Sequence, residues 1–293
     1  MLNGYSIGFP HLGIYIEHLG RAITIFNFSI TYYALIIATG ILAGAFLAIK
    51  EAEATGQNTD NYYDFALIVV FTSIVGARIY YVIFEWDNYK DNLLSILNLR
   101  AGGLAIYGAV IAAVITLIVF AKKKKMSIGL MMDTGCLGLL LGQIIGRWGN
   151  FMNREAFGGY TDGLFAMQIK LAEVYSGYIT PEIAENIKVV DGIEYIQVHP
   201  TFLYESLWNL AVFAILMFYR RHKRFDSEVF CFYLIGYGIG RTWIEGLRTD
   251  QLKFGGVAVS QVLSIFLVVA ATAYVVYRRN QQRKSEWKEL LDK

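Results

Sequence analysis

Residues 146–159 combine side chains that can bind a phosphate group. This stretch contains two arginines, two asparagines, a glutamate and four glycines, and it directly follows the apolar run 137–145. A guanidinium group is always charged and can bind two phosphate oxygens at once. Arg147 and Asn150 are three residues apart and share one face of a helix. The glycines beside them permit close approach of the backbone, so the stretch predicts an anion site.

A second set of charges recurs at helical spacing towards the C-terminus. Arg241, Glu245 and Arg248 are separated by four and three residues, which places them on one helix face. Each polar feature has a structural explanation when taken alone: Glu245 neutralises Arg241, Arg78 extends to the headgroup layer, and glycines allow helices to pack closely. A shared cavity is favoured only if these clusters lie at one depth.

Membrane helices are the elements that must carry these residues. The chain has 293 residues, of which 56% are hydrophobic and 17% are charged, and its mean hydropathy is +0.44. Apolar stretches close to the ~20 residues that cross a bilayer recur along the chain, which favours helices over a β-barrel. We expect an all-α integral membrane protein with seven transmembrane helices at about 29–49, 64–84, 103–121, 128–146, 201–219, 228–246 and 256–277.

Lysine and arginine counts orient these helices. The connections on one side carry 15 such residues, mostly in clusters at 122–125, 220–224 and beyond 278, whereas the other side carries 9 that are spread out. The positive-inside rule puts the N-terminus outside and the C-terminus inside. The polar residues above then all lie in the outer half of the membrane, where phospholipid headgroups are the natural anion. The net charge of +2 gives nucleic-acid binding no support.

Three further segments complete the predicted domain organisation. Residues 1–28 lack a spanning run and predict an N-terminal interfacial segment before the transmembrane domain of residues 29–277. Short alternating pieces and an Asp-Gly turn signal in 160–198 predict a small extracytoplasmic cap of partly β character between the fourth and fifth helices. Residues 278–293 are expected to form a basic cytoplasmic tail.

Neither a protein nucleophile nor a metal site is expected. Cys136 and Cys231 lie in apolar runs, which is typical of small buried side chains. The four histidines are scattered, so we predict no metal and no other cofactor. If the protein is an enzyme, the nucleophile should come from its substrate.

A long motif in the first stretch resembles the signature of bacterial prolipoprotein diacylglyceryl transferases: Gly146-Arg147-x-Gly149-Asn150-Phe151-x-Asn153-x-Glu155-x-x-Gly158. The resemblance covers nearly the whole chain and implies seven spans with an outside N-terminus. Further matching positions are Tyr33, Gly76-x-Arg78, Gly102-Gly103, Tyr107-Gly108, His199-Pro200-Thr201, Leu203-Tyr204-Glu205, Arg241, Glu245 and Arg248.

The resemblance implies a multi-pass enzyme of the bacterial cytoplasmic membrane whose active site faces the extracytoplasmic side. Members of this family transfer the diacylglyceryl group of phosphatidylglycerol to the lipobox cysteine thiol of a prolipoprotein signal peptide and release glycerol phosphate. The expected partners are therefore phosphatidylglycerol, prolipoproteins and membrane lipid, with no nucleic acid.

Roles for individual residues follow from this resemblance as hypotheses. Arg147 and Arg241 would bind the phosphate and stabilise the leaving group. Their charge would lower the pKa of the incoming thiol from about 8.5. The candidates for its proton are His199, Glu245 and Tyr107, in no firm order. Some family members have a histidine at the position of Tyr107, proposed as the base, and this chain departs from them.

The remaining substrate-binding candidates surround these groups. Asn150 would orient the headgroup, and Glu155 would hold Arg147 or Arg154 in place. The full set is Arg147, Asn150, Gly102, Gly103, Tyr33, Arg78, Asn153, Glu155, Gly158 and Arg248.

Two other classes of protein stay open. A seven-helix transporter or binding protein for an anionic ligand should carry polar residues through the midplane, whereas the inner halves here look apolar, and no internal repeat supports an inverted-repeat transporter. A different phospholipid headgroup transferase would use another acceptor.

Overall fold

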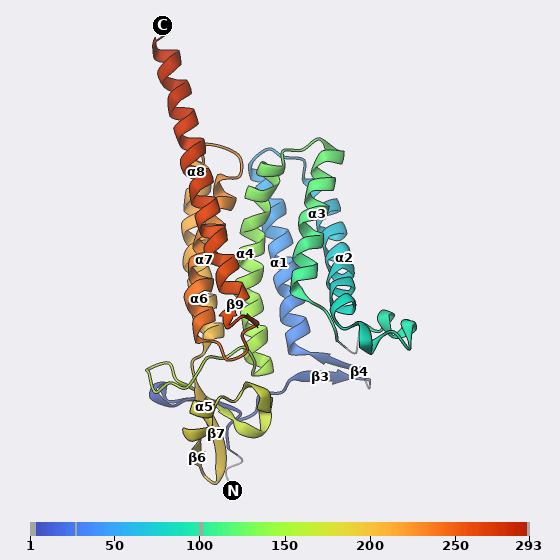
Figure 1. The fold of residues 1–293 in the computed structure, drawn as a ribbon, viewed down its shortest axis with the longest axis vertical. Helices are drawn as coiled ribbons and strands as arrows, with labels where there is room; N and C mark the ends of the chain where they lie inside the picture. Colours follow the sequence, from blue (N-terminus) through green and yellow to red (C-terminus); the bar gives the residue numbers. More distant parts are fainter. Residues whose placement is uncertain (1–3, 27, 100–101, 292–293) are drawn as a thin grey trace. The chain divides into compact units, whose positions relative to one another are not determined.

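The computed structural model describes residues 4–26, 28–99 and 102–291, and Figure 1 shows its helices and strands. The chain forms two compact units, one of Met1–Gly44 with Leu137–Lys293 and the other of Ala45–Cys136. We call them the large and the small unit and describe each by itself. Arg100 and Ala101, at the start of the predicted third span, lie outside the described residues.

Long helices occupy all of the predicted spans. Within the described residues, six helices are long and apolar enough to cross a membrane, as expected of a membrane protein. α7 falls short of that composition because its 20 residues include Arg241 and Glu245. The long helices are α1 (Tyr32–Ala54), α2 (Thr59–Phe84), α3 (Ile106–Lys124), α4 (Ile128–Asn153), α6 (Thr201–Tyr219), α7 (Glu228–Leu247) and α8 (Val259–Leu291).

Two helices run well past their expected ends: α8 continues from the predicted end at 277 to Leu291, and α4 also extends. The apolar run predicts an end near residue 146, but the helix continues to Asn153. Polar residues do not stop a helix when their side chains find partners, and Asn150 and Asn153 both do so here. The chain leaves the helix through Arg154 and Ala156, whose φ values of 54° and 57° are unusual for residues other than glycine.

Glycines let the helices of each unit pack closely. In the large unit, Gly40 and Gly44 of α1 face Gly142 and Gly138 of α4, and a Cβ atom at Gly44 would lie 2.5 Å from the carbonyl oxygen of Gly138. This is the small-residue spacing that brings membrane helices together. In the small unit, α2 and α3 meet in the same way.

A five-stranded antiparallel sheet completes the large unit. Its order is β2-β1-β5-β7-β6. Figure 1 shows the sheet at the end of α6 and α7 that is remote from the C-terminus, and β7 leads directly into α6. The strands are β1 (Ile7–Phe9), β2 (Ile14–Ile16), β5 (Met167–Lys170), β6 (Lys188–Val190) and β7 (Ile193–Val198).

The N-terminal segment, predicted to be interfacial, contains short strands. β1 pairs with β5, which is far away in the sequence, so local pattern did not reveal it. The side chain of Ile7 is fully buried in a core that also contains Phe157, Ile196 and Phe202. A two-stranded hairpin, β3 (Ala22–Ile25) and β4 (Phe28–Thr31), then leads into α1.

Candidate active site

An ion-pair network joins α4, α6 and α7 of the large unit. Arg147 Nη2 lies 2.7 Å from Glu205 Oε1, and Arg241 Nη1 lies 3.3 Å from Glu205 Oε2. Arg241 Nη2 also lies 2.6 Å from Glu245 Oε2. Glu205 is 2% exposed and Glu245 is 3% exposed. Both carboxylates have lost most of their hydration, and the ion pairs with these guanidinium groups compensate for that loss.

The network continues past the end of α7. Arg248 Nη1 lies 3.7 Å from Glu245 Oε2, and Arg248 donates two hydrogen bonds of 2.9 and 2.7 Å to the carboxylate of Asp250. Arg241, Glu245 and Arg248 thus interact in the way that their spacing predicts. Three arginines and three carboxylates take part, so the formal charges of the network cancel.

Glu205 is the centre of this network. Guanidinium groups from two helices, Arg147 of α4 and Arg241 of α7, reach the two oxygens of its carboxylate. Two converging guanidinium groups can bind a phosphate, because each of them can donate hydrogen bonds to different oxygens of the same anion. The geometry therefore provides an anion site whose position is taken by a side chain of the protein.

A second carboxylate, that of Glu155, lies over the last turn of α4. Asn150 Nδ2 and Asn153 Nδ2 donate to Glu155 Oε1 at 3.0 and 3.3 Å, and Arg147 Nη1 reaches Asn150 Oδ1 at 3.5 Å. Among the described residues, the hydrogen-bond partners of Glu155 are thus asparagine amides and not the guanidinium groups of Arg147 or Arg154. The chain reversal after Asn153 turns Glu155 back over the helix, and the asparagine amides are the donors that it meets.

Arg154 instead stabilises the sheet end of the large unit. Its Nε lies 2.8 Å from Glu173 Oε2, and its side chain is only 1% exposed. It also donates to the carbonyl oxygens of Met152 and Leu19. Arg154 thereby ties the end of α4 to the N-terminal segment.

Tyr33, on the first turn of α1, packs against α4 at Gly149. A Cβ atom at Gly149 would lie 2.9 Å from Cδ2 of the Tyr33 ring. Glycine at this position therefore lets the ring lie directly against α4. Tyr33 is also close enough to Glu155 and Arg147 to interact with their charges.

Gly158 brings His199 and the end of α7 together. Gly158 N donates to His199 O at 2.9 Å, and Gly159 N donates to Leu247 O at 2.9 Å. A Cβ atom at Gly158 would lie 2.8 Å from Cβ of His199 and 2.9 Å from the Leu247 carbonyl oxygen. A larger residue cannot fit, and the backbone of His199 is thus held next to the strand-like bridge between Gly158 and Arg248.

The His199 ring is half-buried beside Tyr204. Its Nδ1 lies 3.3 Å from the Tyr204 hydroxyl. Burial lowers the pKa of His199 below its usual value, and the charge of Glu182 opposes this shift only in part. The neutral imidazole, which can accept a proton, is therefore the favoured form at neutral pH.

Arg78, in the small unit, does not present its guanidinium to a ligand. All five N–H groups of this buried side chain have backbone carbonyl partners. The acceptors are the carbonyl oxygens of Ser95 (2.9 Å), Ile96 (2.7 Å), Asn98 (3.2 Å), Gly102 (2.7 Å) and Gly103 (2.9 Å). Arg78 therefore organises the connection between α2 and α3, and its role in substrate binding stays a prediction.

Gly102 and Gly103 are explained by the same interaction. Their φ values are +84° and +80°, which side chains rarely tolerate. A Cβ atom at Gly103 would also clash with Nη1 of Arg78. Tyr107 follows on the first turn of α3, with its ring centroid 6.5 Å from that of Tyr80. These residues and Arg78 form one group in the small unit, and the other predicted site residues form a group in the large unit.

Comparison with known proteins gives the family. Residues 21–277 match the prolipoprotein diacylglyceryl transferase family. The chain belongs to this family. It is 43% identical over 258 residues to the phosphatidylglycerol--prolipoprotein diacylglyceryl transferase of Bacillus mycoides (strain KBAB4), and 44% identical to those of Bacillus cereus (strain Q1) and Bacillus anthracis. Each alignment covers 88% of this chain and 91% of the relative.

For this prolipoprotein diacylglyceryl transferase family member, sequence reasoning missed the central carboxylate. Glu205 lies among the positions that match the family, yet its sequence context indicates no role for it. Its position could have indicated that role. Glu205 lies in the first turns of α6, close in sequence to His199, and an acid buried in a membrane helix needs a cationic partner. Asp250, which pairs with Arg248, was missed as well.

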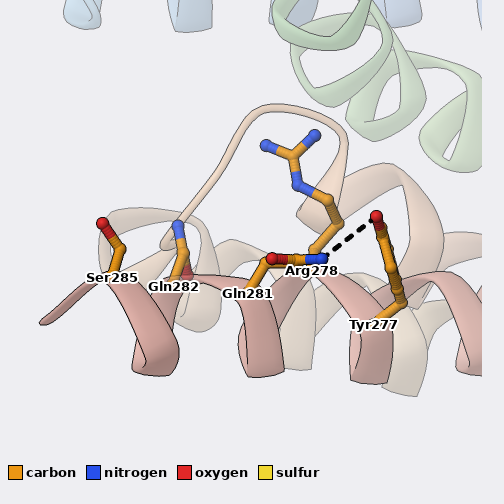
Figure 2. Close-up of a pocket in the computed structure, with 5 residues that line it drawn as sticks. All are labelled: Tyr277, Arg278, Gln281, Gln282 and Ser285. Carbon is orange, nitrogen blue, oxygen red and sulfur yellow. Dashed lines mark hydrogen bonds between the residues drawn. The ribbon is translucent and has the colours of Figure 1, made fainter. Parts of the chain in front are cut away.

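A shallow surface pocket lies on the part of α8 that extends beyond the other helices of the large unit. Figure 2 shows its lining residues, among which Gln281 Nε2 donates to the Tyr277 hydroxyl at 3.2 Å. None of the predicted site residues lines this pocket. In this transferase the pocket is therefore separate from the residues of the ion-pair network.

Proposed function

We propose that this chain transfers the diacylglyceryl group of phosphatidylglycerol to the lipobox cysteine of prolipoproteins, the first step of bacterial lipoprotein maturation. The single observation that carries the proposal is the convergence of Arg147 and Arg241 on one anion position at Glu205. Family membership supports the reaction class, and the names of the relatives supply both substrates.

The reaction forms one bond and breaks one. The cysteine sulfur attacks the glyceryl carbon that carries the phosphate, a C–S bond forms, and the C–O bond to the phosphate breaks. Negative charge gathers on the departing glycerol phosphate. Arg147 and Arg241 stabilise that charge, and fixed guanidinium groups in a site removed from water are well suited to this role.

The thiol proton must be accepted before or during attack, because the thiolate is the competent nucleophile. Glu245 is engaged by both Arg241 and Arg248, which leaves it poorly placed to take a proton. His199 is favoured over it because burial keeps the imidazole neutral. The proton then passes to glycerol phosphate as that product leaves.

The other residues of the large unit position these groups. Asn150 orients the headgroup, and its own amide is held by Glu155. Asn153 holds the same carboxylate, and the Tyr33 ring packs against Gly149. Gly158 keeps His199 next to Arg248.

The membrane arrangement is part of the proposal. α7 acts as a seventh span, with its charged end in the outer half of the membrane and its flanks covered by α6 and α8. The N-terminus and the sheet face the extracytoplasmic side of the bacterial cytoplasmic membrane, the active site opens to that side, and the basic end of α8 lies in the cytoplasm.

Reconstitution with phosphatidylglycerol and a lipobox peptide tests the function. We expect thioether formation on the peptide, and a loss of roughly 100- to 1,000-fold for Arg147→Ala, as when one charge-stabilising donor is removed. Arg283→Ala, on the exposed end of α8, serves as the control and should transfer at the wild-type rate. A peptide with serine in place of cysteine should give no product. Transfer to that peptide would favour a different headgroup transferase, and wild-type activity of Arg147→Ala would refute the role of the network.

A further inference from the structure

Glu205 occupies the position that the proposed function assigns to the phosphate. Arg147 and Arg241 reach its two oxygens, and the carboxylate is almost fully buried. Our inference rests on the proposed function. It concerns how the lipid phosphate reaches the two guanidinium groups that Glu205 already occupies.

Charge balance prevents the phosphate from simply joining the network. The three arginines are already matched by the carboxylates of Glu205, Glu245 and Asp250. A phosphodiester adds a negative charge beside a carboxylate that is 2% exposed, and like charges repel strongly where water is excluded. One carboxylate has to move, and Glu205 is the one that holds both phosphate-binding arginines.

A receiving group for the displaced carboxylate lies one turn further along α6. Asn209 is 1% exposed, and its Nδ2 has no hydrogen-bond partner among the described residues. A buried amide donor is costly unless it is hydrogen-bonded. Residues four apart are neighbours on a helix, and side chains lean towards the helix N-terminus, so the Asn209 amide leans towards Glu205.

The turn of α6 between Glu205 and Asn209 is hydrogen-bonded to two neighbouring helices. Ser206 Oγ donates to Ile144 O of α4 at 3.1 Å, and Trp208 Nε1 donates to Gly236 O of α7 at 2.8 Å. The helix is therefore fixed to both neighbours between Glu205 and Asn209. Any exchange of partners is confined to the Glu205 side chain.

We propose that Glu205 is a displaceable internal anion: it holds Arg147 and Arg241 together in the empty site, and a phosphate ester displaces it onto Asn209. The arginines are thus kept convergent before lipid binds, which limits the cost of organising the site. After transfer, the return of Glu205 to the arginines competes with glycerol phosphate and promotes its release. Glu205 is on this account a positioning residue, and it takes no part in bond making.

Binding of glycerol 1-phosphate to the purified full-length protein, measured by titration calorimetry in detergent, tests the exchange. Glu205→Gln removes the competing charge and should bind this probe about tenfold more tightly than wild type. Asn209→Leu keeps a similar volume but removes the receiving donor, so it should weaken binding severalfold. In Glu205→Gln the substitution Asn209→Leu should have no further effect, because the displaced carboxylate is absent.

Glu245→Gln is the matched control for net charge. It removes a carboxylate from the same network, but its binding should still be weakened by Asn209→Leu. Kinetics with phosphatidylglycerol in mixed micelles separate the lipid from free phosphate: Glu205→Gln should lower KM for the lipid and also lower kcat through slow product release.

Unchanged or weaker glycerol 1-phosphate binding by Glu205→Gln would overturn the inference, as would an Asn209→Leu effect of equal size in the Glu205→Gln background. If Glu205→Gln does not fold, the Asn209→Leu result decides alone, and wild-type affinity in that variant refutes the exchange. Failure of the wild-type protein to transfer lipid would instead refute the proposed function.

Discussion

In the small unit, the guanidinium of Arg78 packs against Gly103 and donates a hydrogen bond to its carbonyl oxygen. Arg78 Nη1 donates to Gly103 O at 2.9 Å, and the positive φ of Gly103 turns its carbonyl oxygen towards the guanidinium without a side chain in the way. An arginine that sequence pattern favours as a ligand for lipid is in this way a structural group, because its donors are fully used.

This relationship predicts a loss of stability rather than of lipid affinity. Gly103→Ala should destabilise the protein by about 1–3 kcal/mol, because alanine is strained at this φ and its Cβ meets the guanidinium. Arg78→Lys should also destabilise, since lysine has three donors for five carbonyls. Thermal unfolding in detergent measures both, and KM for phosphatidylglycerol, measured well below the transition, should stay at its wild-type value. A raised KM with unchanged stability in Arg78→Lys would restore Arg78 as a substrate ligand.

The contact between Asn150 and Glu155 predicts a rescue. Asn150→Asp places two carboxylates against each other at the end of α4 and should reduce kcat/KM roughly 10- to 100-fold through repulsion. Glu155→Gln combined with Asn150→Asp restores a donor and an acceptor and should recover much of the loss. Rates of transfer to a lipobox peptide provide the measurement. A double variant as impaired as Asn150→Asp alone would show that Asn150 acts by another route.

The buried pair of Arg154 and Glu173 predicts a purely structural effect. Glu173→Ala leaves a guanidinium that is 1% exposed without its carboxylate, so unfolding should become easier by about 3–5 kcal/mol. Lys50 and Glu53 form an exposed pair at a similar distance of 2.7 Å, and Glu53→Ala should change the stability far less than Glu173→Ala, because water solvates both charges. Thermal unfolding of both variants makes the comparison, and equal effects would contradict the assigned difference in burial.

The lowered pKa of His199 predicts the acid limb of the pH profile. Burial disfavours the imidazolium, so the neutral base persists below the usual pKa of about 6.5 and is lost only as pH falls further. kcat/KM should therefore start to decline at a lower pH than it would for a base with an ordinary imidazole pKa, and rates measured across the acid range check this. The groups that face the ring are Tyr204 and Glu182.

His199→Gln should abolish this acid limb and lower the rate at neutral pH by roughly 100-fold or more, as for the loss of a general base. Tyr107→Phe, which keeps the ring on α3, serves as the comparison and should retain most of the activity. The reverse pattern would assign the base to Tyr107.

The sequence alone determines the features that depend on neighbours along the chain. Apolar runs of spanning length predict the membrane helices, and a period of 3.6 residues is enough to put Arg241 and Glu245 on one face of α7. The motif from Gly146 to Gly158 is local as well, which is why its residues suffice to indicate the family.

Only the tertiary structure decides which partner a polar group finds across elements. Whether Arg78 faces a ligand or five carbonyl groups depends on the path of the chain between α2 and α3, and the β1–β2 pair joins the larger sheet only because β5 lies beside β1. The central role of Glu205 likewise requires that α4, α6 and α7 turn three faces towards one point. Helix spacing contains no information on that rotation, because interhelical packing sets it.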